Sequence, residues 1–144
     1  MAGSFLVNLI HSTDDPDRAT VGMVVANTAV ASGLETVVFL STEGVRLGMQ
    51  GGGDSIAEPG FKPMKELLTS FTEAGGKLWV CSPCFKKRNL PEDQLLPNAT
   101  LVGGARMIEF ITNGAGSVTY LQRYNIPRQT RHSCTTKAQL ALSA

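Results

Sequence analysis

Short apolar runs with strand character alternate along this chain with windows of helical period, and this alternation constrains the possible folds more than any other feature. Five such runs are present: SFLVNLIHS, ETVVFLS, KLWVC, ATLVGG and GSVTYLQ. The alternation is typical of a mostly parallel sheet that helices cover on both faces. The sequence therefore predicts an α/β fold that is flavodoxin-like, with a mostly parallel five-stranded sheet and helices on both faces.

The windows between the strands contain signals of helix starts and stops. Asp15 is a suitable N-cap for a helix with Pro16 at its first position, and this helix is expected to end near Gly33. Two further apolar stripes predict helices over about 63–75 and 107–114. The segment TEGVRLGMQGGGDSIAEPGF has too much glycine and too little period for a regular element, so we interpret it as a functional loop.

The length of the chain predicts its domain organisation. At 144 residues it is close to the usual size of one domain. We expect a single domain over residues 1–144, with a core over about 4–121 and a C-terminal tail over 122–144 that has no strong period.

Charge and hydropathy argue against several classes of protein. A formal net charge of +1 provides no field that gathers phosphates, so no nucleic-acid partner is expected. The apolar runs are too short to span a membrane and the N-terminus lacks the basic residues of a signal peptide, so we expect no membrane partner and a cytoplasmic location. Three cysteines are too few for a disulfide framework, and their thiols are expected to be reduced.

Polar residues follow the predicted strands where functional sites of parallel sheets lie, beyond the carboxyl ends. His11 and Ser12 end the first run, Glu43 and Gly44 follow the second, and Cys81 ends the third. We expect these residues to form one site. Within it, His11 is the candidate general base or proton shuttle, and Glu43 is a candidate for orienting a partner.

The segment KLWVCSPCFKKR adds a second thiol and a helix start to that site. Ser82 is a suitable N-cap and Pro83 a suitable first helical residue. The amide groups of such a helix start, together with the basic residues 86–88, would stabilise a thiolate. We therefore expect a lowered pKa for Cys81, and reactive thiols at both Cys81 and Cys84.

The cysteine pair has three further interpretations. Both side chains could be small buried hydrophobes, which cysteine often is. The CxxC spacing is also that of dithiol redox proteins, although in thioredoxin the motif follows an early strand. A zinc site would need His132 and Cys134, whose HxC spacing is unusual for a metal site, so we expect neither a metal nor a cofactor.

Taken together, FLSTEGVRLG, WVCSPCFKKRNL and ATLVGGARMIEFI resemble the DsrE/DsrF-like proteins, small sulfur-relay subunits that include the TusD type. The resemblance covers about residues 4–121, and a cysteine followed seven positions later by an arginine matches Cys81 and Arg88. The sequence departs from the pattern at Asn89, where the relay proteins tend to have glycine, and at Cys84, which is an additional thiol.

The resemblance implies that Cys81 carries sulfane sulfur as a persulfide and passes it between sulfur donor and acceptor proteins or small thiols. It also implies a homo-oligomer, usually a trimer or hexamer. Cys84 could then resolve the persulfide or protect the nucleophile. The candidate binding residues around the cysteines are Ser12, Glu43, Gly44, Ser82 and Arg88. Two alternatives are a CxxC dithiol–disulfide oxidoreductase and an oligomeric small-ligand-binding module with structural cysteines.

Overall fold

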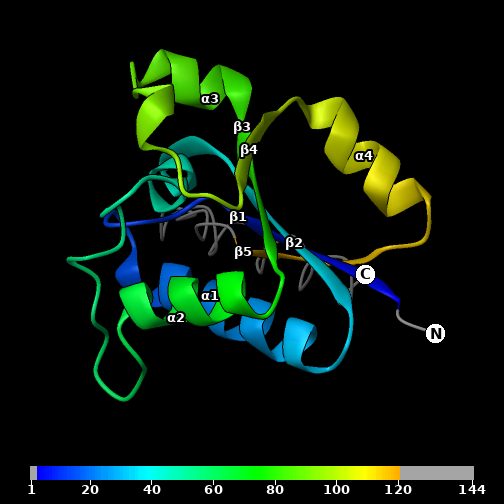
Figure 1. Cartoon of the computed structure of the whole chain (residues 1–144), viewed down its shortest axis with the longest axis horizontal. Coiled ribbons are helices and arrows are strands. Elements are labelled where there is room, and N and C mark those ends of the chain that lie inside the picture. Colours follow the sequence, from blue (N-terminus) through cyan, green and yellow to red (C-terminus); the bar gives the residue numbers. More distant parts are fainter. Residues whose placement is uncertain (1–2, 121–144) are drawn as a thin grey trace, which may run out of the picture.

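A computed structural model describes residues 3–120 and contains a single five-stranded sheet in that part of the chain. Each neighbouring pair of strands is parallel, and the order is β4-β3-β2-β1-β5 (Figure 1). The strands are β1 (Ser4–Leu9), β2 (Glu35–Leu40), β3 (Lys77–Cys81), β4 (Ala99–Val102) and β5 (Gly116–Tyr120). The predicted α/β fold with five parallel strands is confirmed, whereas Cys134 and His132 lie outside the described residues.

Helices cover both faces of the sheet, as predicted. Helices α1 (Pro16–Ala31) and α2 (Met64–Glu73) pack together on one face, and α4 (Gly104–Thr112) lies on the other (Figure 1). The short helix α3 (Ser82–Lys87) follows β3 directly at the carboxyl edge. None of the helices among residues 3–120 combines the length and apolar character needed to cross a membrane.

The strand order explains why the helices divide between the faces. The chain moves from β1 through β4 in one direction across the sheet, and then returns to place β5 on the other side of β1. Since crossover connections between parallel strands are right-handed, reversing the direction moves the connecting helix to the opposite face. Because these strands are all parallel, the carboxyl ends of β1, β2, β3 and β4 lie along one edge of the sheet.

The core has two parts because neighbouring strand residues face opposite sides of the sheet. On the side of α1 and α2, Val7 packs with fully buried residues of both helices, including Met23 and Phe71. On the side of α4, the buried set is Leu6, Val37, Phe39 and Trp79. The ring of Trp79 meets the edge of Phe110 on α4 at a centroid distance of 5.2 Å.

The predicted signals at the start of α1 are borne out. The Asp15 carboxylate accepts a hydrogen bond of 3.1 Å from the backbone N–H of Arg18, and Pro16 occupies the first turn. Past the end of the helix, Gly33 has a φ of 81°. This left-handed conformation favours glycine and allows the chain to turn into β2.

The prediction of an irregular loop over 42–61 was wrong for residues 42–48 and correct for residues 49–61, which contain no helix or strand beyond an isolated bridge at Met49. Residues Thr42–Gly48 form a 3₁₀ helix, η1, and a second short one, η2 (Glu92–Gln94), precedes β4. The glycines in and near η1 allow its backbone to pack closely against the rest of the fold. The spacing of apolar residues in the sequence does not reveal such packing. A Cβ at Gly53 would lie 2.5 Å from Cγ of Met64 on α2, so this segment is packed against the core.

We predict that Gly44→Ala lowers the free energy of unfolding by about 1–3 kcal/mol, because overpacking against rigid backbone is costly. A Cβ at Gly44 would lie 2.3 Å from the carbonyl oxygen of Leu9 at the end of β1. The matched control is Gly104→Ala, where the added Cβ would meet no other part of residues 3–120 within 4 Å and a gain of about 0.5 kcal/mol is expected. Urea denaturation measures both, and equal stabilities would contradict the close packing.

Candidate functional site

The carboxyl edge of the sheet brings several of the predicted site residues together, in two groups. The first group contains Cys81, Cys84 and Arg88 around α3, with Glu43 of η1 beside them. The second group is centred on His11 at the end of β1. The strand order places β2 between the two groups.

Cys81 occupies the N-cap of α3, and its half-buried thiol is free. The sequence predicted Ser82 at this position, but the helix begins one residue earlier and Ser82 is its first residue. The backbone N–H of Cys84, at the third helical position, therefore faces the Cys81 sulfur in the way an N-cap side chain faces the first turn. The contact lacks the geometry of a full capping hydrogen bond.

The expected lowering of the Cys81 pKa was wrong. Burial of the thiol is the main cause that raises its pKa above the ordinary value, and the neighbouring Cys84 thiol raises it further. The Cys84 backbone N–H and the positive charge of Arg88 act in the opposite direction without outweighing burial. The resting site therefore holds a protonated thiol at neutral pH, with Arg88 as the nearby charge that favours the thiolate.

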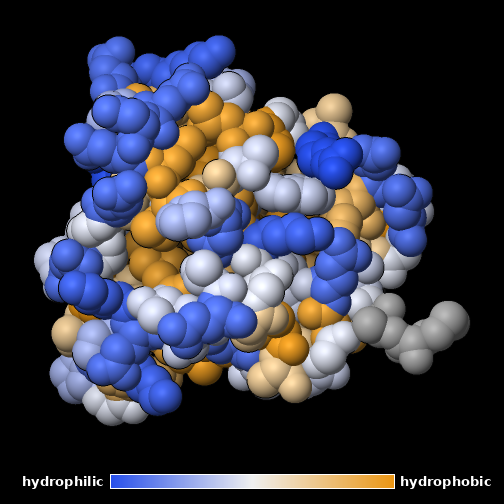
Figure 2. Space-filling model, viewed as in Figure 1, coloured by the Kyte–Doolittle hydropathy of each residue, from blue (hydrophilic) through white to orange (hydrophobic). Residues whose placement is uncertain are grey.

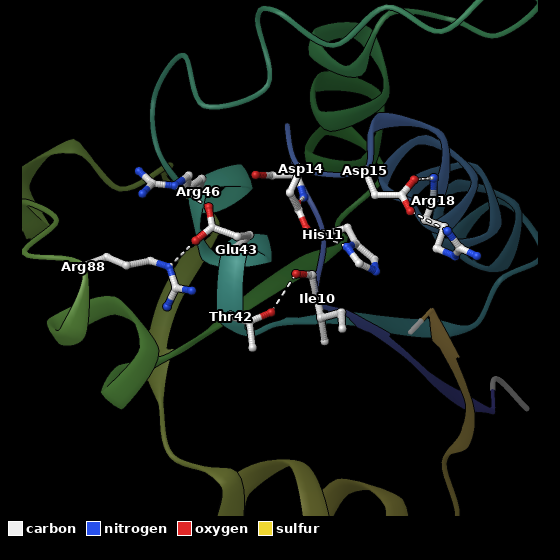
Figure 3. A network of polar contacts seen from close by, with 10 residues as sticks. Ile10, His11, Asp14, Asp15, Arg18, Thr42, Glu43, Arg46 and Arg88 are labelled. Carbon is white, nitrogen blue, oxygen red and sulfur yellow. Dashed lines mark hydrogen bonds and ion pairs between the residues drawn. The ribbon is translucent and has the colours of Figure 1, made fainter. Parts of the chain in front are cut away.

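Arg88 is bound to Glu43 (Figure 3), and it also contacts the backbone of Cys84. Its Nε donates a hydrogen bond of 2.8 Å to the Glu43 carboxylate, and its Nη1 donates one of 3.1 Å to the carbonyl oxygen of Cys84. Glu43 also accepts a 2.8 Å hydrogen bond from Arg46. Arg46 and then Arg88 hold the pKa of Glu43 below its usual range, so its carboxylate is ionised at neutral pH.

Thr42 is a site residue that the sequence analysis missed. It is a β-branched residue with a φ of 50°, a left-handed conformation that costs about 1–3 kcal/mol. Its Oγ1 donates a 2.7 Å hydrogen bond to the carbonyl oxygen of Ile10, just past β1. No composition or period signals such a conformation, because it depends on how the turn meets a neighbouring strand.

His11 is buried, and its Nδ1 donates a hydrogen bond of 2.8 Å to Asp14. Burial acts to raise the pKa of Asp14, but hydrogen bonds from the Ser12 backbone N–H and from His11 outweigh it and lower the pKa. The ionised Asp14 thus fixes the proton of His11 on Nδ1. Within residues 3–120, Nε2 of His11 and the hydroxyl of Ser12 are buried without a hydrogen-bond partner.

Two strand spacings, about 10 Å, separate the ends of β1 and β3. In the described part of the chain, no hydrogen bond joins His11 to Cys81 or Cys84. Figure 3 shows the imidazole on the Arg18 side of β1, opposite to the Glu43–Arg88 pair. A direct proton transfer from Cys81 to His11 has no support from this arrangement, and the role of His11 stays a prediction.

The start of α4 completes the surroundings of Cys81. In the β3–β4 register Cys81 pairs with Val102, which Gly103 and Gly104 follow at the start of α4. Among residues 3–120, no neighbouring part of the fold lies within 4 Å of a Cβ built at either glycine, so these residues leave the start of α4 sterically open.

A metal centre finds no support among residues 3–120. No group of three or more His, Cys, Asp or Glu side chains in that range is placed to hold a metal ion. The zinc set considered from the sequence depended on His132 and Cys134, which lie outside the described residues. The exposed Lys86 and Lys87 form no ion pair in the described residues, so Arg88 alone of the three basic residues is fixed beside the thiols.

We predict opposite effects of two substitutions on the reactivity of Cys81. Arg88→Gln removes a charge that favours the thiolate, so alkylation of Cys81 should need higher pH. Cys84→Ala removes a thiol that disfavours it, so alkylation should proceed at lower pH. Each rate at pH 8 should change by about two- to fivefold relative to the parent.

Iodoacetamide modification across a pH series, with peptide mapping of Cys81, provides the measurement. The exposed Lys86→Gln is the control for a simple loss of positive charge and should match the parent. Shifts of the same sign for Arg88→Gln and Cys84→Ala would contradict the account of the site.

Asn89, where the sequence departs from the resemblance, lies in the turn that ends α3. It follows Arg88 and has a φ of 51°. Asparagine adopts this left-handed conformation more readily than other non-glycine residues. Asparagine is therefore compatible with this turn, as glycine would be.

Two solved structures resemble this fold. The ychN protein from E. coli superposes with a TM-score of 0.65 at 16% identity, covering 81% of this chain and 99% of that one. The protein of unknown function MTH1491 from Methanobacterium thermoautotrophicum gives a TM-score of 0.63 at 17% identity, covering 81% and 98%. At such low identity the likeness concerns the fold alone.

Sequence comparison gives the family. The uncharacterized protein MJ0989 of Methanocaldococcus jannaschii is 30% identical over 116 residues, covering 81% of this chain and 98% of that protein. The uncharacterized protein MK0008 of Methanopyrus kandleri is 34% identical over 86 residues, covering 59% and 67%. The DsrE/DsrF-like family matches residues 4–120, nearly the whole described range, and the chain therefore belongs to the DsrE/DsrF-like family.

Proposed function

We propose that this protein transfers sulfur by carrying sulfane sulfur as a persulfide on Cys81. Membership in the DsrE/DsrF-like family supports a sulfur-relay-type role at the family level. The observation that carries the proposal is the position of the Cys81 thiol at the carboxyl edge of the sheet, with the Cys84 N–H facing its sulfur and Arg88 nearby. An accessible thiol with groups that favour its thiolate is what sulfur transfer requires.

The proposed transfer is a pair of thiol exchanges without net oxidation. The Cys81 thiolate attacks the outer sulfur of a donor persulfide, the donor S–S bond breaks, and the donor leaves as a thiolate. An acceptor thiolate then attacks the outer sulfur of the Cys81 persulfide and releases Cys81 as a thiolate. Because burial raises the pKa of Cys81, loading should accelerate as pH rises, with Arg88 keeping part of the thiol ionised.

A second candidate, a dithiol–disulfide oxidoreductase, is favoured by the contact between the two thiols. The Cys84 thiol is near enough to the Cys81 thiol to raise its pKa. In a persulfidated protein the Cys84 thiolate could attack the inner sulfur, forming a Cys81–Cys84 disulfide and releasing hydrosulfide. The two cysteine sulfurs are oxidised as the sulfane sulfur is reduced, and a reducing thiol must then restore the pair.

The partners that we propose are sulfur donor and acceptor proteins or small thiols in the reducing cytoplasm, and further copies of this chain. Apolar surface lies exposed between the hydrophilic residues over α3 and those over α4 (Figure 2). On α4, Ile108 is 55% exposed. Such surface supports association of several copies, and the trimer or hexamer that we propose is the assembly that the family resemblance implies. Light scattering that gives a 15.3 kDa monomer at micromolar concentration would contradict it.

We predict that a persulfide donor adds one sulfur, about 32 Da, to each chain, and that a reductant removes it. Peptide mapping should place the sulfur on Cys81. Cys81→Ser should abolish the addition. Cys84→Ser should allow loading and change only the rate at which the sulfur leaves.

The two candidate functions differ in their thiol balance. A sulfur carrier gains mass on Cys81 and keeps the Cys84 thiol, whereas an oxidoreductase loses both thiols under mild oxidation without gaining a sulfur atom. Loading that survives Cys81→Ser and disappears in Cys84→Ser would reverse the two roles. Loading that neither substitution changes would exclude both cysteines as carriers.

A further inference from the structure

The strained backbone of Thr42 lies at the carboxyl end of β2, between the His11 group and the cysteines. Its φ of 50° is unusual for a β-branched residue, whose Cβ crowds the backbone in this conformation. The side chain is exposed, so burial of the side chain does not account for the conformation. Contacts of the turn itself must hold the backbone there.

Those contacts fasten the turn to the end of β1. The hydroxyl of Thr42 donates to the carbonyl oxygen of Ile10 at 2.7 Å, and the backbone N–H of Gly44 donates to the same oxygen at 3.0 Å. Gly44 approaches the Leu9 carbonyl so closely that no Cβ fits. The turn is thus bound to β1 at both ends, by the Thr42 hydroxyl at one end and by the Gly44 backbone N–H at the other.

Glu43 lies between Thr42 and Gly44, which both donate hydrogen bonds to the Ile10 carbonyl oxygen, and its carboxylate points to α3. It accepts the 2.8 Å hydrogen bonds from Arg88 and Arg46 (Figure 3). The side chain of Arg88 is only 17% exposed, and its Nη1 reaches the carbonyl oxygen of Cys84 at 3.1 Å. An unbroken series of contacts therefore runs from the end of β1 to the cysteine pair.

We propose that Thr42 is a positioning residue of the sulfur-transfer site, whose hydroxyl holds the strained turn that directs Glu43 to Arg88 beside Cys81. The inference rests on the proposed function only in naming the reaction that the site performs. Without the hydroxyl, the backbone relaxes out of the left-handed region and the Glu43 carboxylate moves away from α3. Arg88 then loses its anchor, and its guanidinium moves into solvent, away from the Cys81 sulfur.

The test compares Thr42→Val with the parent in the full-length protein. Valine keeps the shape of threonine and lacks the hydroxyl, while Ile10 still accepts from the Gly44 N–H. Alkylation of Cys81 at pH 8 should slow by about threefold, because less thiolate is present when Arg88 moves away. The pH profile of alkylation should shift to higher pH, and Thr42→Ser, which keeps the hydroxyl, should restore the parent profile.

Thr69→Val is the matched control. The Thr69 hydroxyl is exposed and donates a hydrogen bond of 2.8 Å to a backbone carbonyl, as the Thr42 hydroxyl does, but it lies on α2. Its loss should leave the alkylation profile unchanged. A Thr42→Val profile that matches the parent, or a shift of equal size in Thr69→Val, would overturn the inference.

Thr42→Ala keeps the inference falsifiable if the valine variant does not fold. Alanine lacks the hydroxyl and the β-branch but keeps a Cβ that disfavours a φ of 50°. The backbone should therefore still relax and the alkylation of Cys81 should still slow, whereas an unchanged profile would overturn the role of the hydroxyl. Because alkylation needs no sulfur donor, a failure of persulfide loading would refute the proposed function and leave this result standing.

Discussion

The parallel pairing of the strands is the constraint on which the site depends. In a parallel sheet all carboxyl ends lie along one edge, and the registers fix which residues meet there: Leu9 pairs with Leu40, and Cys81 with Val102. The order β4-β3-β2-β1-β5 then places the end of β2 between the ends of β1 and β3. The hydrogen bonds that lead from the end of β1 toward the cysteines pass through the turn that follows β2, where Thr42 and Glu43 lie.

The Glu43–Arg88 contact is the part of this connection with a chemical consequence. Burial raises the pKa of Cys81, and the Arg88 charge is one of the two features that oppose it. A guanidinium that is only 17% exposed and bound on two sides retains its position better than a free surface charge. The site therefore combines a protected, protonated resting thiol with a fixed cation that favours the thiolate during transfer.

The sequence predicted those features that depend on neighbouring residues in the chain. The bounds of β3 and the Asp15 cap of α1 were correct, since apolar runs and caps are local patterns. The N-cap at Ser82 was wrong by one residue, because Cys81 takes that position as the strand passes directly into α3. The strand order, the strain at Thr42 and the net effect of burial on Cys81 depend on tertiary packing, which no single segment encodes.

The most direct test of this account is a double-mutant cycle between Glu43→Gln and Arg88→Gln, read out as the alkylation rate of Cys81 at pH 8. If Glu43 acts by holding Arg88 in place, each single substitution slows alkylation, and the double variant is no slower than Arg88→Gln alone. Independent effects that multiply in the double variant, or a Glu43→Gln rate equal to that of the parent, would contradict the account.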